Sequence, residues 1–373
     1  MKIEILMISN LELSAGGRET WLNNFLYGIK KYYNEDISID IHSLEIKNDS
    51  LVFNHTDLLN EHTEYRKNYF KLPVFIGFII QYIFKNILKN KKKDKYIAVG
   101  GVDEVLALLF GNIIFSRKKD RVVWLRTIYT KEKGNRYPKI ILKIILLIEI
   151  FLLKNFFEII IANGEDTAEF YRKFNLNVKV IPNSVFIEKW KNSHSPINMN
   201  KLNIAFVGRL TEVKGFSYFI NSIIEINKIS SNFNFHVIGD GPDRFLIDNV
   251  NNIKYYGSVN NEELPSILKG IDICVALTLY DNNLGGAGVS NALIEQMAAS
   301  KVIICWDNQI FRQLLDENLV YFVKQKDILG LVNVYMEINN NKVIAAEKAR
   351  RSYNLALNYS MENHVCKFID IVK

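Results

Sequence analysis

Short, mostly apolar segments alternate with amphipathic segments along the whole chain. Near the start, the run from Ile3 to Ile8 predicts a buried strand, and a loop of small residues with Gly16 and Gly17 follows it. The next apolar side chains recur at steps of three and four residues, which places them on one face of a helix. They are Trp21, Leu22, Phe25, Leu26 and Ile29. A strand, a glycine turn and a helix in this order predict the opening of a doubly wound α/β domain.

This order of elements occurs in both halves of the chain. Further strands of the first half are predicted at 38–41, 96–99, 121–125, 158–161 and 178–181. The second half begins again with a strand at 202–207, a glycine turn and a helix. Its later strands are predicted at 233–238, 253–257, 271–276, 302–306 and 320–323. Because strands alternate with helical segments in both halves, we expect two parallel sheets.

The domain organisation follows from this repetition and from length. A chain of 373 residues exceeds what a single hydrophobic core ordinarily holds. We expect a Rossmann-like domain over residues 1–185, a polar linker over 186–200 and a second Rossmann-like domain over 201–355. Residues 356–373 are expected to form a C-terminal helix that crosses back to the first domain.

The positive charge of the chain is confined to its first half. The net charge is +7, and residues 1–182 hold 28 Lys and Arg against 21 Asp and Glu, which accounts for all of it. Such an asymmetry indicates an anionic partner of the first domain, such as a phospholipid surface or an anionic lipid carrier. Nucleic acid is not expected, because the chain has no zinc-finger spacing, RNA-binding signature or helix-turn-helix.

Two segments of the first half are apolar with few charges, 72–84 and 137–162. Lys85, Lys89 and Lys92 follow the first segment on one helical face, and Lys139, Lys143 and Lys154 share a face of the second. Each segment fits two interpretations: a core helix with a solvated lysine stripe, or a helix that lies on an anionic membrane. Neither predicts a membrane-spanning helix, because charged residues interrupt every candidate window.

Cysteine use and the start of the chain bear on location. Cys274, Cys305 and Cys366 are far apart in sequence, so neither a disulfide framework nor a zinc cluster is predicted. The first ten residues read as a charged strand rather than as a secretory signal. We therefore expect a cytoplasmic protein, peripheral on the inner face of the cytoplasmic membrane.

Four motifs of the second half stand in a characteristic order: AFVGRLTEVKG from Ala205, VIGDGP from Val237, YYGSVNNEEL from Tyr255 and GGAGVSNALIEQMAAS from Gly285. The first half contributes SAGGRETWLNNF, IANGEDTAEFY and VIPNSV. In order and spacing this series resembles glycosyltransferase family 4, and the resemblance covers the chain to about residue 325. It implies the GT-B fold, in which two Rossmann-like domains face each other across a cleft.

The resemblance also implies the residues of a site. Arg209 and Lys214 would stabilise the diphosphate leaving group and are the candidate catalytic residues. Glu295 would accept hydrogen bonds from the ribose hydroxyls. The donor-binding set is Gly16, Gly17, Gly208, Gly239, Gly257, Val259, Gly288, Val289, Ser290, Asn291 and Glu295. The donor would be a nucleoside-diphosphate sugar, with UDP as the expected nucleotide, and no cofactor or metal ion is expected.

Two departures from the family pattern leave alternatives open. Ala287 stands where the family usually has a glutamate eight positions before Glu295, and no histidine follows the strand at 121–125, where Arg126 and Thr127 stand instead. The leading hypothesis is a retaining glycosyltransferase that acts on a glycan or lipid-linked saccharide in cell-surface polysaccharide synthesis. The alternatives are a non-catalytic nucleotide-sugar-binding subunit and a sugar-nucleotide 2-epimerase.

Overall fold

The computed structural model describes residues 1–11, 17–33, 36–45, 59–89, 92–132, 134, 137–248, 250–280 and 290–373. These residues form two compact units, each with its own parallel sheet. The described part of unit 1 comprises residues up to Asn183 and the C-terminal segment Met361–Lys373. Unit 2 comprises the described residues between Ser184 and Ser360. Two doubly wound parallel-sheet units were predicted from the sequence, and this fold class is confirmed.

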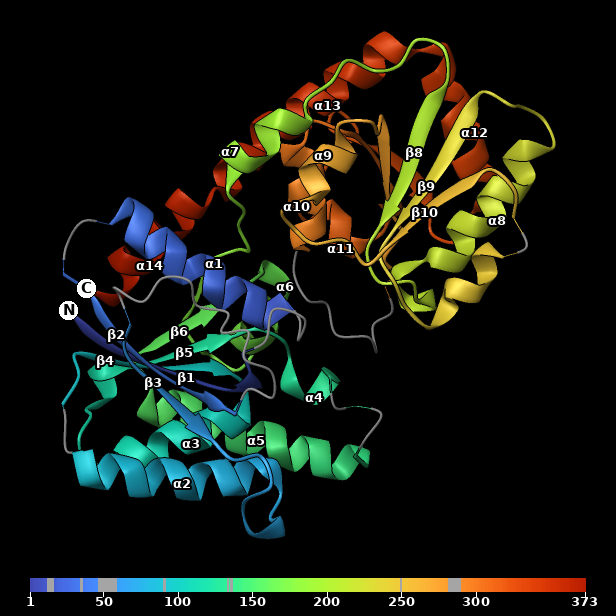
Figure 1. Ribbon diagram of the computed structural model, residues 1–373. Coiled ribbons are helices and arrows are strands. Elements are labelled where there is room, and N and C mark those ends of the chain that lie inside the picture. The colour runs from blue at the N-terminus through green and yellow to red at the C-terminus, as the bar shows by residue number, and fades with distance from the viewer. Residues whose placement is uncertain are drawn as a thin grey trace. The chain divides into compact units, whose positions relative to one another are not determined.

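Unit 1 contains a seven-stranded parallel sheet in the order β3-β2-β1-β4-β5-β6-β7 (Figure 1). Across the sheet, the strands from β3 to β1 stand in the reverse of their chain order, and those from β4 to β7 follow it, as in a doubly wound fold. The strands are β1 (Lys2–Asn10), β2 (Ser38–Leu44), β3 (Leu59–Tyr65), β4 (Lys95–Gly100), β5 (Arg121–Leu125), β6 (Ile159–Ala162) and β7 (Val178–Val180). The interior strand β5 is buried along its whole length, as expected for a strand that is covered on both faces.

Helices cover both faces of this sheet. In Figure 1, α2 (Val74–Lys89), α3 (Val102–Asn112) and α5 (Lys139–Phe156) form one layer, and α1 (Gly17–Tyr32) and α14 (Met361–Val372) lie on the opposite face. The shorter helices are α4 (Tyr129–Glu132) and α6 (Glu165–Arg172).

An aromatic cluster holds α14 against α1 and β5. The Trp21 indole N–H donates to Nε2 of His364 at 3.0 Å, so the other ring nitrogen of His364 carries the proton and donates to the Pro182 carbonyl at 2.8 Å. Trp124 stacks on both His364 and Phe368. Burial lowers the pKa of His364 to about 3, which keeps the ring neutral. The C-terminal helix is therefore part of the core of unit 1.

Unit 2 contains a six-stranded parallel sheet in the order β10-β9-β8-β11-β12-β13. Its strands are β8 (Leu202–Val207), β9 (Phe233–Ile238), β10 (Ile253–Gly257), β11 (Ile273–Ala276), β12 (Val302–Asp307) and β13 (Tyr321–Lys324). Its helices are α7 (Ile187–Trp190), α8 (Phe216–Asn227), α9 (Leu264–Leu268), α10 (Asn291–Ala298), α11 (Gln309–Arg312), α12 (Ile328–Asn340) and α13 (Lys342–Ala356). Across this sheet, the strands from β10 to β8 stand in the reverse of their chain order and those from β11 to β13 follow it, as in unit 1.

The segment 186–200, expected to be a linker, is part of unit 2. It begins with α7, and Trp190 at the end of that helix is buried in the hydrophobic core of this unit. His194 further anchors the segment, because its Nε2 lies 2.8 Å from the Ala298 carbonyl at the end of α10. A polar composition was therefore misleading here, since a few buried side chains suffice to anchor a segment that is otherwise largely exposed.

Candidate functional site

The carboxyl ends of three strands in unit 2 are joined through glycines. Gly208 follows β8 and donates its N–H to the Ile238 carbonyl at 2.9 Å, and Gly239 follows β9 and donates to the Gly257 carbonyl at 2.8 Å. Gly239 has a φ of 132°, and a Cβ at this position would overlap the Gly208 carbonyl oxygen. Only glycine allows this close approach of two backbones. Three of the predicted donor-binding glycines therefore lie together at one edge of the sheet.

Backbone hydrogen bonds hold the loop from Gly208 to Gly215 against two neighbouring segments. Leu210 donates its N–H to the Asp240 carbonyl at 3.0 Å, which ties the loop to the end of β9. On the other side, Leu279 donates to the Val213 carbonyl at 2.9 Å, which ties it to the segment after β11. Gly215 has a φ of 78°, and a Cβ there would overlap the Leu277 carbonyl oxygen. The loop thus spans the point between β8 and β11 where the strand order reverses, the usual ligand position in open α/β sheets.

This loop carries the two predicted catalytic cations. Arg209 is exposed and Lys214 is half-buried. Burial, and secondarily the positive charge of Arg209, lower the pKa of Lys214. Within the residues that the structure describes, neither side chain has a hydrogen-bond or ion-pair partner, although the Lys214 backbone N–H is capped by the Thr211 hydroxyl at 3.4 Å. Two cations without counter-ions at a strand-to-helix loop form a site suited to an anion.

Glu295 lies in α10, whose first turn is capped by Ser290. The Ser290 hydroxyl accepts the N–H of Leu293 at 3.3 Å, and Asn291 begins the helix with its buried Oδ1 unpaired. Burial raises the pKa of Glu295 to about 7, and the nearby positive charge of Lys189 opposes that shift. Among the described residues, no donor is bonded to its carboxylate. Both oxygens are therefore available to accept hydroxyl groups of a ligand.

The remaining predicted site residues fall into three groups. Val259 is half-buried just beyond β10, at the glycine-rich edge. Gly17 begins α1 and belongs to unit 1. Gly16, Gly288 and Val289 lie outside the described residues. Lys189 was not predicted, because only the tertiary fold brings α7 close to Glu295.

Asp240, Arg244 and Tyr255 form a second group that the sequence did not single out. The Arg244 guanidinium carbon lies 5.1 Å from the centre of the Tyr255 ring. Burial and the charge of Asp240 raise the pKa of Tyr255. These side chains border the edge where Gly239 and Gly257 meet, and they extend the polar rim of the candidate site.

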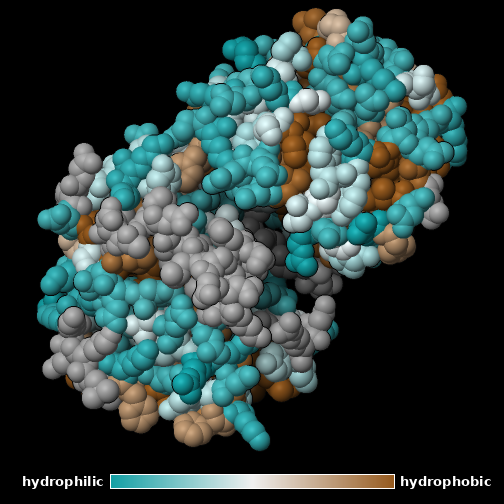
Figure 2. All heavy atoms as spheres, in the orientation of Figure 1, coloured by the Kyte–Doolittle hydropathy of each residue, from teal (hydrophilic) through white to brown (hydrophobic). Residues whose placement is uncertain are grey.

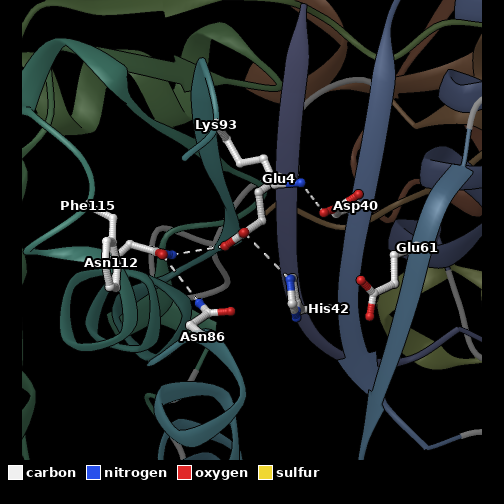
Figure 3. Close-up of a pocket in the computed structure, with 8 residues that line it drawn as sticks. All are labelled: Glu4, Asp40, His42, Glu61, Asn86, Lys93, Asn112 and Phe115. Carbon is white, nitrogen blue, oxygen red and sulfur yellow. Dashed lines mark hydrogen bonds and ion pairs between the residues drawn. The ribbon is translucent and has the colours of Figure 1, made fainter. Parts of the chain in front are cut away.

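A second polar cluster lies inside unit 1, towards the amino ends of its strands (Figure 3). Glu4 accepts a hydrogen bond from Asn112 at 2.9 Å and another from Tyr82, and His42 lies 3.7 Å from its second oxygen. Asp40 forms a buried ion pair with Lys93. Glu4 is thus paired with His42, and Asp40 with Lys93, so we interpret the cluster as structural.

Within the described ranges, no group of three or more His, Cys, Asp or Glu side chains is placed to hold a metal ion. The same ranges contain no helix of sufficient length and hydrophobicity to cross a membrane. Cys274 and Cys305 are buried in strands of unit 2, and burial raises the pKa of both thiols, so neither is a candidate nucleophile.

Comparison with known proteins places this site in context. Residues 201–338 match the family model "Glycosyl transferases group 1". The chain is 27% identical over 244 residues to an uncharacterized 41.2 kDa protein in the cps region of Klebsiella pneumoniae, covering 62% of this chain and 57% of that protein. It is 23% identical over 172 residues to the phosphatidyl-myo-inositol mannosyltransferase of Mycobacterium leprae, covering 44% and 45% respectively. The chain thus spans about half the length of these curated relatives.

Solved structures share the fold over nearly the whole chain. Sucrose-phosphate synthase from Thermosynechococcus elongatus superposes with a TM-score of 0.75 at 12% identity, over 99% of this chain and 97% of that one. Anabaena HepE in complex with UDP superposes with a TM-score of 0.74 at 14% identity, over 99% of both chains. At these identities the likeness concerns the fold alone.

Proposed function

We propose that the chain transfers a sugar from a nucleoside-diphosphate sugar to a glycan or lipid-linked saccharide, with retention of the anomeric configuration. The match of residues 201–338 to the glycosyl transferases group 1 family model supports this proposal. The observation that carries this proposal is the pair of cations, Arg209 and Lys214, on a loop fixed by glycines where the sheet order of unit 2 reverses. UDP is the proposed nucleotide, and HepE, which shares the fold, is solved in complexes with UDP and UDP-glucose.

The proposed chemistry requires positioning and charge stabilisation. As the bond to the sugar breaks, negative charge develops on the diphosphate, and preorganised cations lower the barrier because they meet that charge without reorganisation. Arg209 and Lys214 supply the cations, and Glu295 orients the nucleoside through its ribose hydroxyls. The departing phosphate takes the proton of the acceptor hydroxyl on the same face of the sugar. In this proposal the protein supplies no nucleophile and no metal ion takes part.

The acceptor belongs to cell-surface polysaccharide synthesis in this proposal. One curated relative is encoded in the cps region of Klebsiella pneumoniae, and another is named a phosphatidyl-myo-inositol mannosyltransferase. A lipid-linked acceptor lies at a membrane, so the enzyme that uses it benefits from a surface that binds lipid. Unit 1 offers such a surface.

Helix α5 presents its apolar residues to solvent. Ile144, Leu147 and Phe151 are 51%, 58% and 60% exposed, and Ile140, Ile141 and Ile148 on the same helix are also exposed. The side that faces the core carries Leu153 and Glu149, both buried, and Glu149 accepts a hydrogen bond from Tyr171 at 3.0 Å. The interpretation of α5 as a core helix with a solvated lysine stripe is therefore wrong, because lysines and apolar residues share the solvent side.

The apolar surface continues from α5 to the end of α3. Ile113 and Ile114 follow α3 and are 50% and 86% exposed. Arg121 binds the carbonyls of Ile113 and Phe156, which places these residues beside the end of α5. Figure 2 shows apolar residues among the polar ones along the lower edge of unit 1, where Figure 1 places α2 and α5. We call the exposed residues of α5 together with Ile113 and Ile114 the apolar face.

Lysines lie within and around the apolar face. Lys139 and Lys143 are exposed on α5, and the ammonium group of Lys118 donates to the Lys154 carbonyl at 2.8 Å, at the end of that helix. Exposed apolar side chains together with lysines fit the interface of an anionic bilayer. Lys93, by contrast, is buried against Asp40, so it does not contribute to a lipid-binding stripe. We therefore propose a cytoplasmic enzyme held at the membrane through unit 1.

The test of the proposed function is acceptor-dependent release of nucleoside diphosphate. The full chain is mixed with UDP-sugars, with and without a lipid-linked saccharide, and free UDP and the anomeric configuration of the product are measured by NMR. We expect UDP release only with acceptor, and a product with the donor's configuration. Donor binding without release would favour the non-catalytic subunit, and conversion of the sugar nucleotide without acceptor would favour the epimerase.

A further inference from the structure

Two arginines of unit 1 are buried to the same degree but differ in their hydrogen bonds. Arg121 begins β5 and is 5% exposed, whereas Arg126 follows the end of β5 and is 6% exposed. Arg121 donates from Nε to the Ser116 hydroxyl at 2.7 Å and from its two terminal nitrogens to backbone carbonyls. Arg126 makes one bond, from Nη2 to the Asn183 side-chain oxygen at 2.9 Å.

The remaining donors of Arg126 are unpaired. Its Nε and Nη1 are buried and have no hydrogen-bond partner, and among the described residues no carboxylate forms an ion pair with it. Its guanidinium carbon lies 4.4 Å from the centre of the Trp21 ring in α1. Burial lowers the pKa of Arg126 to about 9, the charge of Arg18 adds to that effect, and Glu19 opposes it. A buried cation in this state destabilises the fold unless an anion joins it.

The position of Arg126 is one where ligands bind in this class of fold. It stands at the carboxyl edge of the sheet, next to the first turn of α1, a helix of 16 residues whose amino end favours negative charge. Arg18 in that turn adds a second cation; its Nη1 lies 3.4 Å from Glu104. Two positive side chains and a helix amino end therefore converge on one place within unit 1.

Asn163 adds a second unpaired group at this edge. Its backbone N–H donates to the Leu125 carbonyl at 3.3 Å, which places the Asn163 backbone beside Arg126. Its buried side-chain oxygen has no partner in the part of the chain that the structure describes. An unpaired acceptor at the same strand edge as unpaired cationic donors suits a ligand with both a hydroxyl group and an oxyanion. Sugar phosphates and sugar acids carry both groups.

We propose that Arg126, Arg18 and the first turn of α1 form an oxyanion subsite in unit 1, which binds the phosphate or carboxylate of a sugar with Asn163 accepting one of its hydroxyls. The diphosphate of the donor is assigned instead to the cations of unit 2. The subsite does not depend on the proposed transferase activity, because every group in it belongs to unit 1.

The experiment measures the thermal stability of the full chain with three probes. Glucose 1-phosphate offers a phosphate, glucuronate offers a carboxylate and glucose offers neither, all at the same ionic strength in chloride. The parent protein carries Arg209→Ala and Lys214→Ala, so that the cations of unit 2 do not contribute. At a concentration of 100 times Kd, we expect one of the two anionic sugars to raise Tm by about 5–10 °C. The preferred probe identifies the anionic group, and glucose should have little effect.

Arg126→Met should abolish this shift while leaving Tm without ligand unchanged or higher, because it removes an unpaired buried charge. Arg121→Met is the matched control: it should lower Tm in every condition, since the carbonyls that Arg121 satisfies lose their donors. Arg18→Gln, at a more exposed position, should reduce the shift several-fold and provides the test if Arg126→Met does not fold. An anion shift that is absent in the parent, or unchanged in Arg126→Met or Arg18→Gln, would overturn the proposal. The proposal would also fail if the Arg126→Met protein were as unstable as the Arg121→Met protein and still showed the shift in Tm.

Discussion

Units 1 and 2 repeat one sheet order but place their positive charges differently. In unit 2, Arg209 and Lys214 stand on a loop at the surface, and glycines fix that loop against two neighbouring strand ends. In unit 1, the corresponding edge has Arg126 buried against an aromatic ring, with two of its nitrogens unpaired. A common topology therefore presents a ligand-binding edge twice, and the side chains at each edge decide which ligand group it suits.

The outer helices of the two units differ as well. In unit 1, six exposed apolar side chains lie on the single helix α5. The exposed apolar residues of unit 2 are dispersed over several elements; Ile229, Phe245, Leu329 and Val343 are examples. Isolated apolar residues are normal on a protein surface, whereas a continuous group indicates an interaction surface. The excess of positive charge also lies in the first half of the chain, so charge and apolar exposure coincide in unit 1.

The largest expected effect concerns this difference in surfaces. We expect Ile144→Glu, Leu147→Glu and Phe151→Glu together to weaken binding of the full chain to anionic vesicles by about 10³-fold, at about 1.5 kcal/mol for each apolar side chain no longer inserted. The matched control replaces Ile229, Val343 and Ile344 of unit 2 by Glu, residues that are also more than half exposed. Sedimentation with anionic and neutral vesicles measures both variants. Equal binding by the two would show that lipid does not contact α5.

The sequence predicted most of the fold because apolar periodicity reports burial on one face of an element. It did not predict β3, whose residues Leu59–Tyr65 are mostly polar, since this edge strand is only partly buried. It also did not determine which side of α5 faces the core, because nearly all of its residues are apolar. The core-facing side carries two buried residues, Leu153 and Glu149, and Glu149 accepts a hydrogen bond from Tyr171.

The candidate site was predictable where backbone geometry restricts the residue type. Gly239 and Gly215 adopt positive φ values beside neighbouring carbonyls, so only glycine fits at these two positions of the motifs. Lys189 and Arg126 could not be found in this way. The role of Lys189 depends on Glu295, which is distant in sequence, and the role of Arg126 depends on donors that have no partner among the described residues. Neither feature produces a local sequence pattern.

A second prediction tests the assignment of the cations in unit 2. We expect Arg209→Ala and Lys214→Ala each to lower kcat about 10²-fold, by analogy with removal of one preorganised charge-stabilising donor. Both variants should keep the Tm of the unsubstituted protein without ligand, because neither side chain bonds to another described residue. Steady-state kinetics with a saturating donor measures the effect. Turnover that survives both changes would mean that the diphosphate is held elsewhere, and the contrast between the two edges would lose its functional meaning.

The smallest expected effect concerns Glu295, whose pKa of about 7 makes nucleotide binding depend on pH. Below pH 7 the carboxyl is protonated and one oxygen no longer accepts a hydroxyl, so UDP affinity should rise as pH increases through 7 and then level off. Glu295→Gln should weaken UDP binding about 10-fold at pH 8 and remove this dependence.

The raised pKa also means that ionisation of Glu295 destabilises the free protein as pH rises from the unfolded value of 4.5 through 7. Glu295→Gln should therefore melt at a higher temperature than the unsubstituted protein at pH 8 without ligand. Calorimetric titration with UDP at pH 6 and pH 8 tests the assignment, which fails if both proteins show the same dependence of affinity on pH.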